Sequence, residues 1–277
     1  LSLHDALPIS TFSKDNTDRN RTSPFAFTGN KFEFRAAGSS QSVAGPNTIL
    51  NAILAQEMIE MAEELEKGKT FDEVVREFIS EHQRIIFNGD GYSVEWEEEA
   101  ARKGLPNNKN TVDALRCLKN EKFIQMLDRL GVYSRTELDS RYDILLENYS
   151  KTIQVEGLTA LKMAKTQIYP VVCGYLAKKA SELTKMQDAG LDSTFMKEET
   201  NQLTALVKEM KEKMDTLEEN IKIAQDSDLD VLDIAMMWRD DVLETMQSLR
   251  ETVDTLENII DSSCWPIPTY VDLLFGI

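Results

Sequence analysis

The sequence contains few of the side chains that most often bind transition metals or act as nucleophiles. Of its 277 residues, three are cysteine and two are histidine. Cys117, Cys173 and Cys264 are far apart and form no CxxC pair, so we expect reduced, buried thiols rather than disulfides or a zinc site. His82 has no second histidine or cysteine in helical register, which disfavours a metal-ligand role. Catalysis by a cysteine–histidine pair is therefore not expected.

Basic residues are also scarce relative to acidic ones. The chain has 31 lysines and arginines against 48 aspartates and glutamates, a formal net charge of -17. Such a charge repels nucleic acid and anionic membranes, and we expect neither as a partner. A polyanionic ligand such as ATP must then bind at a local basic cluster or through a metal ion.

Long apolar runs are absent from the sequence. No segment approaches the roughly 18 apolar residues of a membrane span, and no secretory signal pattern occurs. We therefore predict a cytoplasmic protein. Residues 1–10, LSLHDALPIS, begin without methionine and resemble a translated sequencing-adapter oligonucleotide. We expect this segment to be an artefact and exclude it from fold reasoning.

Apolar residues at helical spacing are abundant in the sequence. Hydrophobic residues make up 42% of the chain and are available for a core. One strand is predicted where Lys31 to Arg35 alternate between charged and aromatic side chains, directly after a Thr28-Gly29-Asn30 turn signal. Downstream, apolar spacing and capping signals predict helices over 48–67, 70–87, 96–102, 110–130 and 136–185. Pro170 is expected to kink or break the last of these.

The region from residue 203 to residue 260 carries two heptad seams, in which apolar residues recur alternately four and three apart. The first seam is Leu203, Val207, Met210, Met214, Leu217, Ile221 and Ala224, and the second is Val242, Met246, Leu249, Val253, Leu256 and Ile260. Because only a short connection separates them, we predict an antiparallel helical hairpin. The hairpin either packs on itself and the body or forms a subunit contact. The rigid, apolar segment Trp265-Pro266-Ile267-Pro268 is expected to dock on the body.

Charged residues gather near the front of the chain. Arg19 and Arg21 lie in a polar loop, and Lys31, Glu33 and Arg35 share one face of the predicted strand. Arginine suits phosphate and carboxylate ligands, and a glutamate can supply one oxygen ligand to Mg²⁺. Such groups neutralise charge in phosphoryl transfer. The alternative is a solvated strand face with ordinary ion pairs.

These motifs resemble those of a known family. The segment RNRTSPFAFTGNKFEFR, followed by Gly45-Pro46-Asn47, resembles the late catalytic motifs of type III glutamine synthetases, and the similarity extends over residues 11–277. The resemblance implies an ATP-dependent ligase that phosphorylates glutamate and lets ammonia displace the phosphate. It also implies glutamate, ammonia and ATP as ligands, Mg²⁺ or Mn²⁺ as the metal, and a homo-oligomer with rings of subunits.

Matching the motifs position by position implies roles for individual residues. Arg21 matches the catalytic arginine that contacts the transferring phosphoryl group, and it would touch both nucleotide and substrate. Glu33 matches a metal ligand, and Arg35 matches the arginine that holds glutamate. Lys31 is a candidate nucleotide contact. Arg19 is a weaker candidate with a structural role.

The sequence departs from the shorter family branch at two places. Ala26 stands where that branch has a second nucleotide-contacting arginine, and Thr28 stands near the place of another basic residue. The family's other metal-binding glutamates and its catalytic aspartate precede the matching segment. One metal ligand is too few for a site, so we expect the chain to be inactive by itself.

We therefore predict a mostly α chain with a short N-terminal β segment. Residues 11–190 would form the C-terminal part of the glutamine synthetase α+β catalytic domain, and residues 191–277 the helical hairpin and tail. The alternative function is a helical oligomerisation or interaction module without catalysis.

Overall fold

The computed structural model describes residues 25–27, 32–34, 41–85 and 90–276. The described residues fall into two compact units. Unit 1 holds those up to Lys109 together with residues 125–133, and unit 2 holds residues 110–124 and 134 onward. The predicted artefact at residues 1–10 lies outside the described residues.

Two short strands form an antiparallel ribbon in unit 1. Strand β1 is Phe25–Phe27 and strand β2 is Phe32–Phe34. The register pairs Phe25 with Phe34, Ala26 with Glu33 and Phe27 with Phe32. The strand predicted from the alternating pattern is therefore present as β2, and its partner is the FAF segment immediately before the turn.

Helices α2 and α3 of unit 1 begin where the sequence supplies capping side chains, whereas α1 begins after Val43, which supplies none. Helix α1 spans Ala44–Glu66, and Gly68 follows it with a φ of 97°, a left-handed conformation that suits glycine. The Thr70 hydroxyl and the Glu73 carboxylate form the expected capping box of α2, Phe71–His82. A 3₁₀ turn, η1, covers Gln83–Ile85, and Ser93 caps α3, Val94–Arg102.

An ion-pair bridge joins the end of α1 to α2. The Lys69 ammonium lies 2.7 Å from Glu64 and 2.6 Å from Glu77. Hydrogen bonds from Lys67 and Lys69 lower the pKa of Glu64 to about 2. Both partners are solvent-accessible, so this bridge orients the two helices more than it stabilises them.

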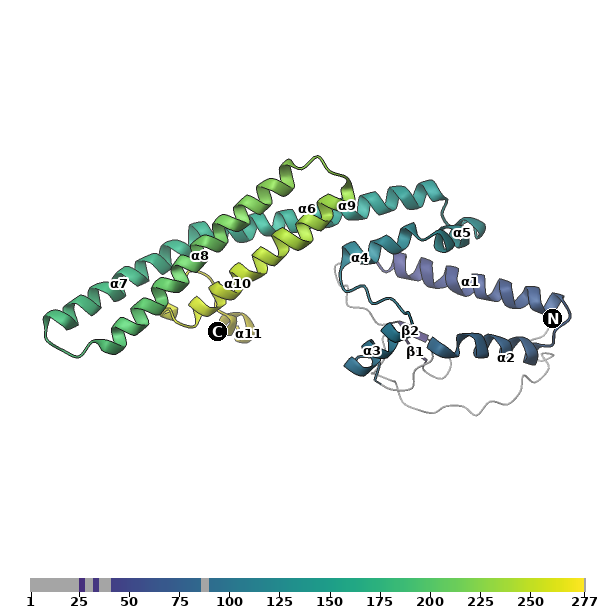
Figure 1. Ribbon diagram of the computed structural model, residues 1–277, viewed down its shortest axis with the longest axis horizontal. Coiled ribbons are helices and arrows are strands. Elements are labelled where there is room, and N and C mark those ends of the chain that lie inside the picture. The colour runs from purple at the N-terminus through teal and green to yellow at the C-terminus, as the bar shows by residue number, and fades with distance from the viewer. Residues whose placement is uncertain (1–24, 28–31, 35–40, 86–89, 277) are drawn as a thin grey trace. The chain divides into compact units, whose positions relative to one another are not determined.

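Unit 2 is built around one long helical rod (Figure 1). Helix α4, Thr111–Leu115, and the 3₁₀ turn η2, Arg116–Lys119, precede α5, Glu121–Arg129, through which the boundary between the units runs. The rod consists of α6, Arg135–Met163, a π-helical turn η3, Ala164–Ile168, and α7, Tyr169–Asp188. A capping box of Ser134 and Glu137 starts it.

The predicted hairpin packs along this rod. Helix α8 is Thr194–Asp226, and a four-residue connection leads to α9, Val231–Met237, a second π-helical turn η4, Trp238–Leu243, and α10, Glu244–Glu257. Helix α8 contacts both α7 and α10, and α6 contacts α9 and η4. All seven residues of the first predicted seam are buried, as are Val242, Leu249, Leu256 and Ile260 of the second. The hairpin thus packs on itself and on the rod.

Pro170 lies just after the first π-helical turn. Proline has no amide hydrogen and clashes with the carbonyl one turn before it, so an uninterrupted α-helix cannot pass through it. The wider turn at η3 removes this conflict, and α7 begins with Pro170 in its first turn. The predicted interruption is therefore confirmed as a local change of helix type. Helices α7 and α8 belong to one compact unit, although the predicted boundary at residue 190 falls between them.

The C-terminal tail leaves α10 through a 3₁₀ turn, η5, Ser262–Cys264, and ends in α11, Tyr270–Phe275. Trp265 is buried in the core of unit 2, which confirms the predicted docking at that residue. The apolar run that follows is different, because the side chains of Leu273, Leu274 and Phe275 are 69–75% exposed. The docking prediction covered residues 265–268 only, and Ile267 also packs against this core. Among the described helices, none is both long and apolar enough to cross a membrane.

Gly157 marks the closest approach of the rod to the hairpin. A Cβ atom placed there would lie 3.2 Å from Val242 Cγ1 and 3.3 Å from Ile221 Cδ1. A Cβ atom placed on Gly174, in α7, would have no neighbouring atom within 4 Å.

We predict opposite effects for the two glycine-to-alanine substitutions. Gly174→Ala should raise the free energy of unfolding by about 0.5–1 kcal/mol, because alanine restricts the unfolded chain and favours helix. Gly157→Ala should lower it by about 1 kcal/mol, because overpacking against the buried, stiff Val242 outweighs that gain. Urea unfolding followed by far-UV circular dichroism measures both. Equal effects would contradict the tight contact.

Candidate functional site

The sequence-predicted site centres on Glu33, which is the predicted site residue that the structure describes. Glu33 lies in the middle of β2, and its side chain is partly buried. Arg19, Arg21, Lys31 and Arg35 lie outside the described residues. The expected shared face of Lys31, Glu33 and Arg35 therefore stays a prediction.

The register of the two strands makes the residue type at position 26 relevant to Glu33. Ala26 is the register partner of Glu33 across the two strands, and directly opposed residues are the closest neighbours that a sheet offers. The position where the shorter family branch has an arginine is thus directly opposite the predicted metal ligand. In this chain that position carries no charge, so Glu33 receives no compensating cation from residue 26.

Neither around Glu33 nor elsewhere in the described part of the chain are three or more histidine, cysteine, aspartate or glutamate side chains arranged to hold a metal ion. A groove of about 410 Å³ between α1 and α2 does gather carboxylates, from Glu57, Glu60, Glu63, Glu64, Glu77 and Glu81. Glu64 pairs with Lys67 and Lys69, and Glu77 pairs with Lys69, so this groove is an acidic surface rather than a metal centre.

His82 and the three cysteines were considered above as possible catalytic or metal-binding residues, and the structure describes the surroundings of each. The ring of His82 packs on Phe78 with centroids 4.6 Å apart. Cys117, Cys173 and Cys264 form no disulfide, but they are not buried as expected, since Cys117 is exposed and the other two are partly buried. The pKa of the Tyr169 hydroxyl is raised, mainly by a hydrogen bond with Cys173 and to a smaller extent by burial. No described feature near these residues supports nucleophilic catalysis.

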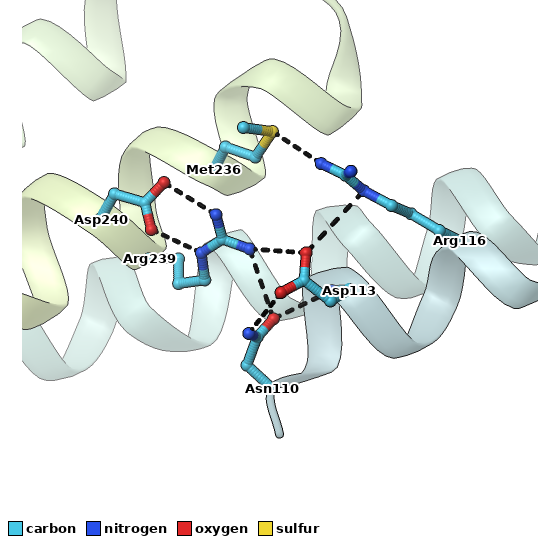
Figure 2. A network of polar contacts seen from close by, with 6 residues as sticks. All are labelled: Asn110, Asp113, Arg116, Met236, Arg239 and Asp240. Atoms are coloured by element: carbon cyan, nitrogen blue, oxygen red, sulfur yellow. Dashed lines mark hydrogen bonds and ion pairs between the residues drawn. The ribbon is translucent and has the colours of Figure 1, made fainter. Parts of the chain in front are cut away.

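The most connected polar cluster in unit 2 surrounds Arg239 (Figure 2). Its guanidinium lies 3.0 Å from Asp113 Oδ1, and it contacts both carboxylate oxygens of Asp240, at 2.5 Å and 2.8 Å. Asn110 accepts from the same guanidinium at 3.4 Å and caps α4 by accepting from the Asp113 amide. Arg116 donates to the sulfur of Met236 beside it. The cluster joins α4 to η4.

The electrostatics of this cluster favour its charged form. Hydrogen bonding by Asn110, and then the Arg239 charge, lower the pKa of Asp113. The hydrogen bond from Arg239 lowers the pKa of Asp240. The Arg239 side chain is only 18% exposed, and every partner is a fixed side chain. The guanidinium makes four hydrogen bonds within the cluster, from its five N–H donors, so the arrangement is a structural clamp.

A second clamp joins α8 to α10. Lys213 Nζ lies 2.6 Å from Glu209, 2.8 Å from the Thr252 hydroxyl and 3.1 Å from the Ser248 carbonyl oxygen. Thr252 is itself buried. Sequence reasoning missed both clamps. A capping pattern at Asn110 and Asp113 is visible in the sequence, but nothing links it to Arg239, 126 residues after Asp113.

Known proteins match nearly the whole chain. The family described as the glutamine synthetase C-terminal domain matches residues 70–187. A type-3 glutamine synthetase from Dictyostelium discoideum is 34% identical over 274 residues, which cover 95% of this chain and 37% of that protein. A glutamine synthetase from Butyrivibrio fibrisolvens is 36% identical over 96% of this chain and 39% of its own length. One from Bacteroides fragilis is 34% identical, with 94% and 38% covered. The chain therefore spans well under half the length of these relatives.

We predict that Arg239→Ala destabilises unit 2. The change leaves Asp113 and Asp240 without their cation and should lower the free energy of unfolding by about 1–2 kcal/mol at pH 7. Lys208→Ala, which removes an exposed pair with Glu212, is the matched control and should change it by less than about 0.5 kcal/mol.

The effect of Arg239→Ala should also depend on pH. The two aspartates have pKa values below those of the unfolded chain, about 3.9. Their stabilisation is therefore present above that value and lost as the pH falls through the lower folded-state values. Urea unfolding at pH 7, 5 and 3 should show a wild-type-to-variant difference that is constant from 7 to 5 and smaller at 3. A difference that grows on acidification contradicts the clamp.

Proposed function

The chain belongs to the glutamine synthetase family, and we propose that it serves the ATP-dependent ligation of ammonia to glutamate. The observation that carries the proposal is the extent of the similarity: 34–36% identity over 94–96% of the chain, to proteins that are all named glutamine synthetase. A helical interaction module without catalysis is not favoured, because the similarity includes the charged ribbon as well as the helices. The proposed compartment is the cytoplasm.

The proposed reaction proceeds through a glutamyl phosphate. ATP transfers its terminal phosphoryl group to the side-chain carboxylate of glutamate, and ammonia then displaces the phosphate. Each step moves negative charge between oxygens, and fixed cations stabilise such a transition state. Mg²⁺ or Mn²⁺ would supply part of that charge when bound.

This chain's residues would contribute one edge of the site. The partly buried Glu33 would bind the metal that bridges the nucleotide phosphates, through one carboxylate oxygen. Arg21 would contact the transferring phosphoryl group, Arg35 the substrate carboxylate, and Lys31 the nucleotide. Because Ala26 faces Glu33 without charge, Lys31 is the remaining candidate for a nucleotide contact next to the ribbon. We place the ribbon in the α+β catalytic domain of the family.

The proposal also implies that the residues of this chain form only part of the metal site. The chain spans about 37–39% of the length of the curated relatives, and a hard cation needs about six oxygen ligands, of which the ribbon supplies one carboxylate. The other ligands would come from segments that the relatives have and this chain does not. We also propose that the whole protein assembles as a homo-oligomer with rings of subunits.

Replacing the predicted metal ligand in a protein that contains both this chain and the upstream segments tests its role. Glu33→Gln keeps the size and removes the charge, so glutamine formation should fall at least about 100-fold at ordinary Mg²⁺, with partial recovery at high Mg²⁺. Glu98→Gln, at an exposed position of α3, is the matched control and should retain activity. Unchanged activity of Glu33→Gln would remove Glu33 from the site.

The chain by itself should be folded but inactive. Purified residues 11–277 should show a helical circular dichroism spectrum and a cooperative unfolding transition, because the core of unit 2 is complete within them. The same sample should form no glutamine from glutamate, ammonia and MgATP above the uncatalysed rate. Substantial turnover would show that the missing segments are not required.

A further inference from the structure

Arg116 directs a charged donor at a thioether sulfur. Its Nη2 atom lies 3.2 Å from the sulfur of Met236, at the edge of the cluster around Arg239 (Figure 2). Arg116 belongs to η2 and Met236 to α9, so the contact joins residues that are 120 positions apart in the sequence. Among the methionines that the structure describes, Met236 is the one whose sulfur accepts a hydrogen bond.

The thioether is a poor partner for this guanidinium. A methionine sulfur is a weak acceptor, whereas a guanidinium has five N–H donors that form their strongest bonds with oxygen atoms. Within the described residues, the other polar contact of the Arg116 side chain is an ion pair with Asp113 at 3.9 Å, which is beyond hydrogen-bond distance. Asp113 is already held by Arg239 at 3.0 Å and by Asn110 at 2.7 Å. Arg116 therefore has N–H donors beside the sulfur that no described acceptor uses.

Met236 lies between the core of unit 2 and the solvent. Its side chain is partly buried and packs against the buried cluster around Tyr142, while the Arg116 side chain beside its sulfur is 49% exposed. Met210 and Met214, by contrast, are at most 1% exposed. A small oxidant can therefore reach the Met236 sulfur when the half-exposed arginine moves, without any opening of the core.

We propose that Met236 is a site of oxidation to methionine sulfoxide and that Arg116 binds the sulfoxide oxygen. Hydrogen peroxide transfers one oxygen atom to the sulfur: an S–O bond forms, the O–O bond breaks, the sulfur loses two electrons, and water leaves. The sulfoxide is polar where the thioether was apolar. Arg116 withdraws by the length of the new bond, which its exposed side chain allows. A weak contact between η2 and α9 thereby becomes a charge-assisted hydrogen bond.

The consequence of oxidation at Met236 differs from that at an ordinary packed methionine. A sulfoxide in a packed site is destabilising, because a polar group without a partner replaces an apolar one. At Met236 the partner is already in place, so oxidation keeps or tightens the contact between η2 and α9. The inference uses none of the residues proposed for the ligase reaction.

Site-resolved oxidation of the wild-type chain tests whether Met236 reacts. After brief treatment of the folded chain with dilute hydrogen peroxide, digestion and mass spectrometry measure the sulfoxide at each methionine. Met58, which is 61% exposed, is the reference and should react first. Met236 should be oxidised at least about 10-fold faster than the buried Met210 and Met214, because exposure governs the reaction. A Met236 that resists oxidation as well as those two overturns the proposal.

A double-mutant cycle tests whether Arg116 binds the oxygen. Glutamine at position 236 stands in for the sulfoxide, because it is unbranched and carries an acceptor oxygen, whereas leucine carries none. The thermal unfolding midpoints of Met236→Gln and Met236→Leu are compared with Arg116 present and in an Arg116→Ala background. The glutamine variant should gain at least about 2 °C relative to the leucine variant when Arg116 is present.

Met237 supplies the matched control, because it is also partly buried and its sulfur has no donor among the described residues. The difference between Met237→Gln and Met237→Leu should be the same in both backgrounds. An equal difference in both backgrounds at Met236 as well would show only a loss of apolar packing, and it overturns the proposal. Neither assay uses substrates, so failure here is distinguishable from failure of the ligase proposal.

Discussion

Burial of the apolar seam of α8 is the constraint on which the rest of unit 2 depends. Leu203, Met210, Met214, Leu217 and Ile221 are each at most 3% exposed. Helix α8 therefore packs against α7 on one side and α10 on the other. Each buried aliphatic side chain contributes about 1.5–3 kcal/mol, so this seam outweighs all the exposed ion pairs of the unit together.

Packing three helices along one seam creates local conflicts, and the structure resolves them at two π-helical turns. At η3 the wider turn allows the rod to continue past Pro170. At η4 it leaves the Asp241 carbonyl oxygen available, and Asn220 of α8 and the Thr245 hydroxyl both donate to it, at 3.1 Å and 2.6 Å. The absence of a side chain at Gly157 lets α6 approach the same turn closely. The polar clamp at Arg239 then fixes α4 against η4.

The proposed chemistry belongs to unit 1 and has a different physical basis. A three-residue ribbon has too few backbone hydrogen bonds to be stable by itself in water, so Glu33 depends on neighbouring structure for its position. The relatives are about two and a half times as long as this chain, and the proposed site needs ligands from their additional segments. Unit 2, by contrast, has a complete core. The chain thus combines a helical unit that has its own core with one edge of the proposed site.

The spacing of apolar residues and the capping side chains in the sequence determined the helical class, the strand at Phe32–Phe34, the capping box at Thr70 and the two buried seams. Both signals involve residues only a few positions apart, so they can be seen without the structure. The motif around Glu33 also sufficed to indicate the family, since a long run of unusual residues is specific without any coordinates. Only the tertiary structure decided that Ala26 opposes Glu33, that Arg239 clamps Asp113, that Gly157 must stay small and that Arg116 faces the sulfur of Met236. Each of these facts depends on which distant segments meet, and their contact is set by the packing of whole helices rather than by any local pattern.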